Sequence, residues 1–434
     1  MRNKMTKTQL GWVMYDWANS AYSLVIVAAI FPQVFLHFAG DRPVFLGVDF
    51  GSADSLYTLS ICFSYAVITL LSPMLSGISD VKGKSKLFMQ IFTGIGSLSC
   101  MFLYFFDAAN LWIGVLGAIL ASIGYSGSLV FYNSYLPQIA EKNEQDSLSA
   151  KGYSYGYVGS SLLLVLLLFA VNIHQTIGFE NEIQVFKAGF ILVGLWWISW
   201  SLWTFRTLPA SAVNNELKGS SISVLLKKGR DELIGVWNEF KAEPNLKRFI
   251  RAFFVTGLGL QTLIIVAPLF AIKTVGMVGE ELIVIVLLMQ LLGVVGAFVF
   301  ARLSKNKGTV ISIISCTIIY LLVCLVAVSG ESKSVFFVLA GLMGFCLGGM
   351  QSQTRSAYTK LLPKTTSYAS YLSFYDVVEK VSIVSGTLIY GTVAYMLRDN
   401  VLISAPKAGM LILSVFFMIA LFLWLPLRKH IITT

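Results

Sequence analysis

The chain has 434 residues, of which 56% are hydrophobic and only 12% are charged. Soluble domains carry about 25% charged residues, so this composition excludes an ordinary soluble protein and indicates a polytopic membrane protein. The formal net charge of +10 suits a protein that meets anionic lipid at the membrane surface, and no nucleic-acid partner is predicted from it.

Long apolar segments recur along the whole chain. A membrane-spanning helix needs about 20 mostly apolar residues, and twelve segments of this kind are predicted. They lie near residues 12–36, 56–79, 87–106, 111–136, 152–172, 185–205, 249–272, 282–301, 309–329, 335–358, 370–396 and 408–427. We therefore expect an all-α membrane protein with twelve transmembrane helices.

The positions of lysine and arginine orient the predicted spans. If both termini lie inside, the inner segments contain 24 of these residues, the outer segments contain 6, and Arg355 and Lys380 fall within spans. This asymmetry follows the positive-inside rule for an even number of spans. We expect a multi-pass protein of the cytoplasmic (inner) membrane with both termini in the cytoplasm.

The first predicted span begins with polar residues, in the sequence YDWANSAYS from Tyr15. Asn19 follows Asp16 by three residues, and Ser23 follows it by seven. With Tyr22 beside them, these residues form a polar stripe along one side of the helix. Asp16 is either a helix-start residue favoured by the positive end of the helix dipole or a carboxylate that faces a cavity. The stripe favours a helix that lines a water-filled path.

A short basic loop, GISDVKGKSK at 77–86, follows the second predicted span. Gly77 allows two helices to approach closely, and Gly83 allows a tight turn. Asp80 is the acid of this loop, and it either accepts hydrogen bonds from the amino terminus of a neighbouring helix as part of a gate or acts only as an anchor. Lys84 and the other lysines of the loop are expected to hold the inner lipid face.

The segment 207–247 is a long polar connection that separates six spans from six. Apolar residues recur in it at helical spacing opposite charges, so an amphipathic helix on the inner membrane face is predicted. These residues are Leu225, Leu226, Leu233, Val236 and Phe240. The expected domains are an N-terminal six-helix bundle (1–206), this cytoplasmic loop, and a C-terminal six-helix bundle (248–434), which is the layout of a transporter built from two related halves.

A short internal repeat supports two related halves. Aligning residues 79–83 (SDVKG) with residues 304–308 (SKNKG) keeps serine, lysine and glycine, and it places Lys305 where the first half has Asp80. The two segments follow the second and the eighth predicted spans. Combined with the six-plus-six arrangement, the repeat indicates an internal duplication.

Charged residues lie within two predicted spans of the second half. Span eleven carries Asp376, Glu379 and Lys380, and spacings of three and four put Asp376 on the same helix face as the other two. Arg355 lies in the inner third of span ten, so the four formal charges sum to zero. An isolated charge at a helix centre costs about 2.5–3.5 kcal/mol, so such residues face a cavity and have partners. The group is either a neutral network that locks two helices or a gate or proton site, with Glu379 as the proton candidate.

Four segments in this order resemble one family. They are YDWANSAY at 15–22, GISDVKGKSK at 77–86, NSYLPQIA with LSAKGYSYGYVGS within 133–160, and GGMQSQTRSAYTKLLPK with YLSFYDVVEK within 348–380. The loop resembles a motif of the major facilitator superfamily. The whole set resembles its vacuole-effluxer-like family, which is related to a yeast autophagy-linked vacuolar amino-acid effluxer. The resemblance implies two pseudo-symmetric six-helix bundles that work by alternating access.

The resemblance also implies roles for particular residues. Asp80 would latch the amino terminus of span eleven, near Ser370, when the outer gate is open. Spans one, four, seven and ten would line the solute cavity, so polar residues at mid-membrane depth in or beside these spans are the substrate-binding candidates. They are Asn19, Tyr22, Tyr132, Gln261, Gln351 and Tyr375. The alternative for each is an interhelical hydrogen bond, worth about 0.6 kcal/mol on average.

Two functional classes remain open. The first is a secondary transporter that moves a small polar solute, such as an amino acid, by alternating access, driven by a proton gradient or by the solute's own gradient. The second is a membrane receptor or an intramembrane enzyme on the same scaffold. The sequence has no metal-ligand or disulfide spacing, no P-loop pattern and no nucleophile–base arrangement. We therefore expect no enzyme, no metal and no cofactor, and a monomer whose partners are the solute, the lipid bilayer and protons.

Overall fold

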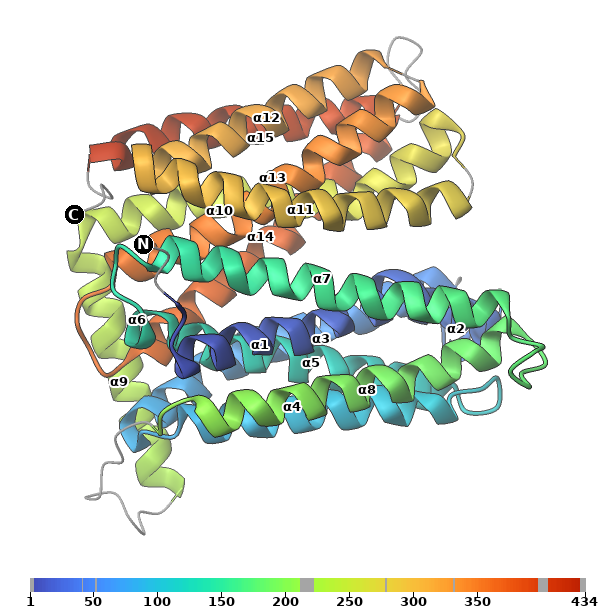
Figure 1. Ribbon diagram of the computed structural model, residues 1–434, viewed down its shortest axis with the longest axis horizontal. Coiled ribbons are helices and arrows are strands. Elements are labelled where there is room, and N and C mark those ends of the chain that lie inside the picture. Colours follow the sequence, from blue (N-terminus) through green and yellow to red (C-terminus); the bar gives the residue numbers. More distant parts are fainter. Residues whose placement is uncertain are drawn as a thin grey trace. The chain divides into compact units, whose positions relative to one another are not determined.

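Helices dominate the computed structural model, which describes residues 4–40, 42–50, 53–210, 222–277, 279–330, 332–396 and 405–429 (Figure 1). The long helices are α1 (Lys7–Ala21), α3 (Ala53–Lys82), α4 (Ser85–Phe102), α5 (Leu111–Ser134), α7 (Gln145–Asn172), α8 (Glu182–Thr207), α9 (Ile222–Ala242), α10 (Pro244–Phe270), α11 (Gly279–Lys307), α12 (Thr309–Ser329), α13 (Lys333–Leu361), α14 (Tyr368–Met396) and α15 (Ala405–Trp424). The short elements are α2 (Phe31–Ala39), α6 (Leu136–Ile139), the π-helical η1 (Tyr22–Ile30) and η4 (Ala271–Val275), the 3-10 turns η2 (Leu103–Phe105) and η5 (Leu425–Lys429), and a hairpin of β1 (Val44–Phe45) and β2 (Val48–Asp49). The described part of the chain is therefore all-α apart from this hairpin, which the sequence does not predict.

Eleven stretches of the described residues are long and apolar enough to cross a membrane. The first, Lys7–Ala39, combines α1, η1 and α2, and ten more follow along the chain. α14 is also 29 residues long, but Asp376, Glu379 and Lys380 interrupt its apolar sequence. With α14 included, the number is consistent with the twelve spans predicted from the sequence. The protein is an integral, multi-pass membrane protein.

The chain divides into two compact units, and unit 1 comprises Met1–Tyr135, Tyr155–Leu233 and Ser367–Ser373. Its long helices run side by side in Figure 1, with α1 packed on α8, α4 on α5 and α8, and α3 on α5. A Cβ atom on Gly124 of α5 would lie 2.4 Å from the backbone nitrogen of Gly96 in α4. Glycine therefore permits backbone-to-backbone contact here, which is a common way for membrane helices to associate.

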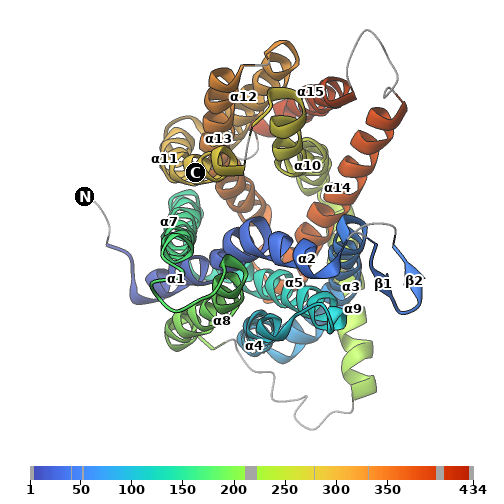
Figure 2. The same cartoon turned by 90° about the vertical axis from the view of Figure 1, so that its right-hand side faces the viewer.

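Unit 2 comprises Leu136–Ser154, Ile234–Thr366 and Phe374–Thr434. α11 packs along α13, α12 packs on α13 and α15, and α10 packs on α15; Figure 2 looks along these helices. A Cβ atom on Gly348 of α13 would lie 2.0 Å from the carbonyl oxygen of Gly293 in α11. The contact between α11 and α13 therefore also depends on the absence of a side chain.

The helix α9 matches the amphipathic helix predicted within 207–247. Val236 and Phe240 are buried, and the Phe240 ring packs against Phe374 of α14 with centroids 6.1 Å apart. Lys227 and Lys228 on the same helix are exposed. Residues 211–221, and the side chains of Leu225 and Leu226, lie outside the described part of the chain.

The first span departs from the continuous helix that the sequence predicts over 12–36. Its middle, Tyr22–Ile30, is π-helical and lies between α1 and α2. Pro32, at the start of α2, has no N–H to donate to the preceding turn, which favours an interruption of the regular hydrogen-bond ladder here. The extent of the span is as predicted, and only its regularity differs. Short π-helical segments occur frequently at functional sites.

Candidate functional site

A cavity in unit 2 gathers polar residues from four helices. Its lining residues are Tyr153 of α7, Phe253, Thr256, Gly257, Leu260 and Gln261 of α10, Met350, Gln351 and Thr354 of α13, and Tyr375 and Glu379 of α14. It holds about 350 Å³ of space outside protein atoms, including space open to solvent. Small-molecule sites are clefts with a few polar groups on mostly apolar walls. The predicted residues Gln261, Gln351 and Tyr375 lie together here.

Glu379 is the acidic residue of this cavity. The Nε2 of Gln261 donates a hydrogen bond to the Oε1 of Glu379 at 3.0 Å, so an amide on α10 orients a carboxylate on α14. The Glu379 side chain is partly exposed. No lysine or arginine among the described residues forms an ion pair with it. The cavity therefore presents a carboxylate that is held by an amide and not by a cation.

Asp376 and Lys380 form a buried ion pair on the same helix. The Nζ of Lys380 donates to the Oδ1 of Asp376, and each residue is 6% exposed. A spacing of four residues places the two side chains on one helix face. No described residue donates a hydrogen bond to the Oδ2 of Asp376. The pair is locally neutral, which leaves the charge of Glu379 uncompensated on this helix.

Arg355, the fourth predicted member of the charge network, is tied to α7. Its Nε donates to the Oγ of Ser149 at 2.9 Å, and its Nη2 donates to the backbone oxygen of Ser149 at 3.0 Å. The guanidinium carbon lies 4.2 Å from the ring centroid of Tyr153, a cation–π contact. Arg355 is 2% exposed. It therefore fastens α13 to the start of α7, beside a tyrosine that lines the cavity.

Three predicted residues belong to a buried aromatic cluster in unit 1. The hydroxyl of Tyr132 donates to the Oδ2 of Asp16 at 2.7 Å, and the Tyr132 ring stacks on Trp12 with centroids 4.6 Å apart. The ring of Tyr22 lies 5.0 Å from that of Tyr125. Asp16 is 4% exposed. It is therefore a buried carboxylate stabilised by a phenol hydroxyl.

Asn19 lies one turn after Asp16 and three residues before the π-helical segment. It is 1% exposed, and no described residue accepts a hydrogen bond from its Nδ2. Its Oδ1 accepts a long hydrogen bond of 3.4 Å from Ser20. A buried amide with an unused donor is unusual in a folded protein. The predicted substrate-binding residues thus fall into two groups, one in each unit.

Asp80, near the end of α3, caps the start of α14 within unit 1. Its Oδ1 accepts a hydrogen bond from the backbone nitrogen of Ala369 at 3.2 Å. Its Oδ2 accepts two more, from the backbone nitrogen and the Oγ of Ser370, each at 2.7 Å. The first N–H groups of a helix have no intrahelical partner, and the helix dipole favours a negative charge beside them. The contact lies at the position where the family resemblance implies a latch.

Gly77, Gly83 and Lys84 surround Asp80 in the sequence. A Cβ atom on Gly77 would lie 2.4 Å from the carbonyl oxygen of Gly229, so only glycine lets α9 approach α3 this closely. Gly83 has a φ of 61°, a left-handed conformation that glycine adopts without strain. Lys84 is exposed immediately before α4. The two glycines therefore permit the close contact of α3 with α9 and the tight turn that follows α3.

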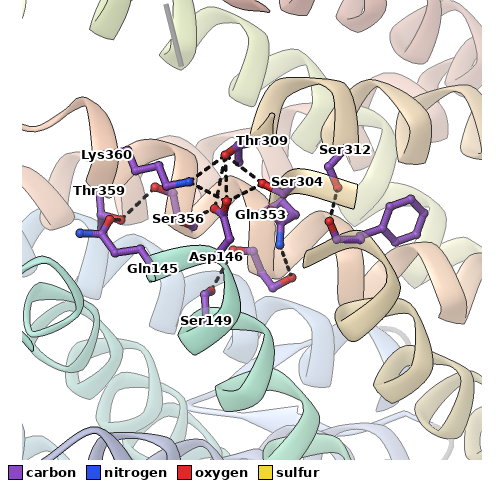
Figure 3. A network of polar contacts seen from close by, with 12 residues as sticks. Gln145, Asp146, Ser149, Ser304, Thr309, Ser312, Gln353, Ser356, Thr359 and Lys360 are labelled. Atoms are coloured by element: carbon purple, nitrogen blue, oxygen red, sulfur yellow. Dashed lines mark hydrogen bonds and ion pairs between the residues drawn. The ribbon is translucent and has the colours of Figure 1, made fainter. Parts of the chain in front are cut away.

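Another buried carboxylate, Asp146 in the first turn of α7, is the centre of a polar network in unit 2 (Figure 3). The Nζ of Lys360 donates to it at 2.6 Å, and the Oγ of Ser356 donates at 2.5 Å. The hydroxyls of Ser304 and Thr309, on either side of the turn between α11 and α12, also donate to this carboxylate. The side chains of Asp146 and Lys360 are 5% and 9% exposed. Asp146 therefore joins α7 to α11, α12 and α13.

The candidates chosen from the sequence omit Asp146 and Lys360. The internal repeat is the sequence feature that points to this network. It aligns Ser304 with Ser79, and it has Lys305 at the position where the first half has the acid Asp80. In the structure, the acid that meets this second turn comes from the start of α7. No local pattern marks Asp146, which follows several other polar residues in a short loop.

Comparison with known proteins gives the family. The family described as "Vacuole effluxer Atg22 like" matches residues 4–146 and 141–431. An uncharacterized MFS-type transporter of Bacillus subtilis (strain 168), YxiO, is 26% identical over 402 residues, which cover 91% of this chain and 90% of that protein.

Solved structures give the fold. The human organic anion transporter MFSD10 (TETRAN) has a TM-score of 0.71 at 12% identity, covering 96% of this chain and 99% of that chain. The major facilitator superfamily transporter FucP, in the outward conformation, has a TM-score of 0.69 at 11% identity, covering 97% and 98%. Identities this low establish a shared fold only. The family match, however, extends over nearly all of the sequence, and the chain belongs to the vacuole effluxer Atg22-like family, with the fold of major facilitator superfamily transporters.

Proposed function

We propose that the protein is a secondary transporter that moves a small polar solute, an amino acid or a similar metabolite, across the cytoplasmic membrane by alternating access. The observation that carries this proposal is the cavity of unit 2, where Glu379, Gln261 and Gln351 present one carboxylate and two amides on otherwise largely apolar and aromatic walls. A family named for efflux supports it. Asn19, Tyr22 and Tyr132 are proposed as further solute contacts, and Glu379 as the residue that couples transport to protons.

The proposal also gives Asp80 and Asp146 roles in gating. Each is a largely buried acid that meets the start or end of other helices through several hydrogen bonds. Contacts of this kind stabilise one of two conformations and must break for the other to form. Asp16, Arg355 and the Asp376–Lys380 pair are proposed to fix the helices that surround these elements.

The transport test uses purified protein in lipid vesicles. Labelled amino acids should cross the membrane faster than in protein-free vesicles. Gln351→Leu should slow transport about two- to tenfold, because one hydrogen bond contributes about 0.5–1.5 kcal/mol. Gln175→Leu, at an exposed position, should transport like the parent. A solute that binds the protein and never crosses the membrane would favour a receptor instead.

The orientation of the termini is tested by cysteine labelling. Asn238→Cys on α9 and Ser332→Cys before α13 are exposed positions on predicted inner and outer sides. In a Cys62→Ser background, which removes the exposed native cysteine, an impermeant thiol reagent should label Ser332→Cys in intact cells. It should label Asn238→Cys only after the membrane is opened. Labelling of both positions from one side would contradict the proposed topology.

The gating role of Asp80 is tested by Asp80→Ala. This variant loses the acceptor for Ala369 and Ser370, so solute exchange should slow severalfold while the amount of inserted protein stays close to that of the parent. Glu141→Ala, an exposed acid removed from the contact, should exchange at the parent rate. The measurement is exchange in vesicles at equal protein content. Equal rates for Asp80→Ala and the parent would leave Asp80 an anchoring role only.

A further inference from the structure

The cavity of unit 2 has an uneven charge. Of its lining side chains, Glu379 alone carries a formal charge at neutral pH. Asp376 and Lys380, one turn away, form an ion pair with each other. Arg355 is held by Ser149 and lies over the ring of Tyr153, and it is not among the lining side chains. A solute that enters the cavity therefore meets one charged side chain, the carboxylate of Glu379.

The carboxylate of Glu379 is only half satisfied by the protein. Gln261 donates to Oε1, and among the described residues none donates to Oε2. A carboxylate away from bulk water is costly unless it is hydrogen-bonded or paired. Its second oxygen is therefore available to a donor that comes from the solute or from water.

Aromatic rings pack together beside Glu379. The rings of Phe253 and Tyr375 stack with centroids 4.3 Å apart at 20°, and Tyr153 adds a third aromatic ring to the lining. Hydrogen bonds between an ammonium group and a carboxylate are among the strong ones in proteins. An anionic solute would be repelled here, and a neutral solute would leave the carboxylate uncompensated.

We propose that Glu379 binds the ammonium group of an amine-bearing solute, and that a proton occupies the same carboxylate when the amine is absent. The inference rests on the proposed transport function. The amine and the proton exclude each other from Glu379, and this can couple their movements only in a protein that transports them. Amine entry releases the proton from Glu379 to water, and amine departure lets one proton return. Either ligand neutralises the carboxylate, so the loaded and the returning carrier both avoid a bare buried charge. The result is exchange of one amine for one proton.

Other ionisable groups face Glu379 from three helices. They are Tyr375, Asp376 and Lys380 on α14, Tyr153 on α7 and Arg355 on α13, whereas α10 presents the uncharged Gln261 and Thr256. Free tyrosine titrates near pH 10 and arginine remains protonated. Asp376 and Lys380 compensate each other. Glu379 is therefore the group whose protonation changes with the occupancy of the cavity.

The test measures binding of a simple amine to the purified full-length protein across acidic to alkaline buffers. The probe is n-butylammonium, with 1-butanol and butyrate as uncharged and anionic probes of matched length. Butylammonium should bind more tightly than both. At acidic pH, where Glu379 is protonated, its Kd should rise about tenfold for each pH unit by which the pH is lowered, because one proton competes with the amine. Amines of this type titrate near lysine, at about 10.4, so the probe itself stays charged.

Variants assign the effect to Glu379. Glu379→Gln should lose both the preference for the amine and the pH dependence. Glu379→Asp, which keeps the charge on a shorter side chain, should keep the pH dependence with weaker binding, and it serves if Glu379→Gln fails to fold. Glu182→Gln, an exposed acid at the start of α8, should behave like the parent.

Two outcomes overturn the inference. One is butanol or butyrate bound as tightly as the amine, and the other is pH-dependent amine binding that survives in Glu379→Gln. If the parent protein shows either outcome and still transports a solute, the proposed transport function is retained and this coupling is rejected. If the amine binds as expected but the protein transports no solute, the amine site is retained and the proposed transport function is rejected.

Discussion

Asp146→Ala is expected to lower the free energy of unfolding by about 3–5 kcal/mol, the range for removing one partner of a buried ion pair. Lys360 would be left with its charge at a site where its side chain is 9% exposed. Ser356 and Thr309 would also lose their shared acceptor. Both losses act in the same direction, because buried polar groups without partners are destabilising. The measurement is unfolding of the purified protein in detergent, followed by tryptophan fluorescence.

Matched variants separate this effect from general damage to the loop. Lys364→Ala removes an exposed lysine four residues after Lys360 and should stay within about 0.5 kcal/mol of the parent. The double variant Asp146→Leu/Lys360→Met should recover much of the loss, since apolar replacement of a whole buried pair is often neutral. If Asp146→Ala unfolds together with the parent, the ion pair contributes nothing to stability and its proposed gating role loses its physical basis.

Asp146 and Asp80 occupy related places with the donor and acceptor roles exchanged. In the first half, the end of α3 supplies the acid and the start of α14 supplies the donors. In the second half, the aligned turn after α11 supplies the hydroxyl of Ser304, and the start of α7 supplies the acid. The same kind of contact is thus made twice with the charge on opposite partners. Lys305, at the position aligned with Asp80, is exposed.

The spans and the membrane class follow from the sequence because hydropathy is a local property. A long apolar segment in a bilayer must satisfy its own backbone hydrogen bonds, which a helix does. The predicted segments and the observed helices therefore coincide within several residues. Gln261 and Gln351 were also recognisable, since polar side chains at mid-membrane depth need a partner or a cavity. The structure places both in the same cavity with Glu379.

The contacts between distant segments could not be predicted in the same way. Arg355 binds Ser149, about 200 residues away in the sequence, and nothing in the sequence near either residue indicates this contact. Asp146 looked like one more polar loop residue, and its burial arises only when α11, α12 and α13 fold around it. The π-helical segment after Ala21 depends on the hydrogen-bond pattern of a whole helix, which residue types alone do not determine.

Glu379→Gln is expected to abolish accumulation driven by a pH gradient, while solute exchange continues only at a raised solute concentration, because the variant lacks the carboxylate proposed to bind the ammonium group. If one proton moves per solute, a gradient of one pH unit supports about tenfold accumulation, since a tenfold ratio and one pH unit both correspond to about 1.4 kcal/mol. Glutamine keeps the size of the side chain and an oxygen that can accept from Gln261, but it neither binds nor releases a proton. The variant should therefore approach equal concentrations on both sides of the vesicle membrane. The measurement is uptake in vesicles with and without an imposed pH gradient, with Glu182→Gln as the control that should accumulate like the parent.

Exchange survives in Glu379→Gln for a physical reason. The loaded carrier needs only to change conformation with the solute bound, and a neutral amide removes the cost of moving an unpaired carboxylate through an apolar region. Loss of exchange even at a raised solute concentration would contradict this prediction and indicate that the solute site fails without the carboxylate. Accumulation that persists in Glu379→Gln would exclude Glu379 as the coupling residue and direct attention to Asp16, which is hydrogen-bonded to Tyr132, or to Asp376, which has one oxygen without a described partner. A parent protein that ignores the pH gradient would instead point to facilitated diffusion or to sodium coupling, because the carboxylate in the cavity would then compensate a cation other than the proton.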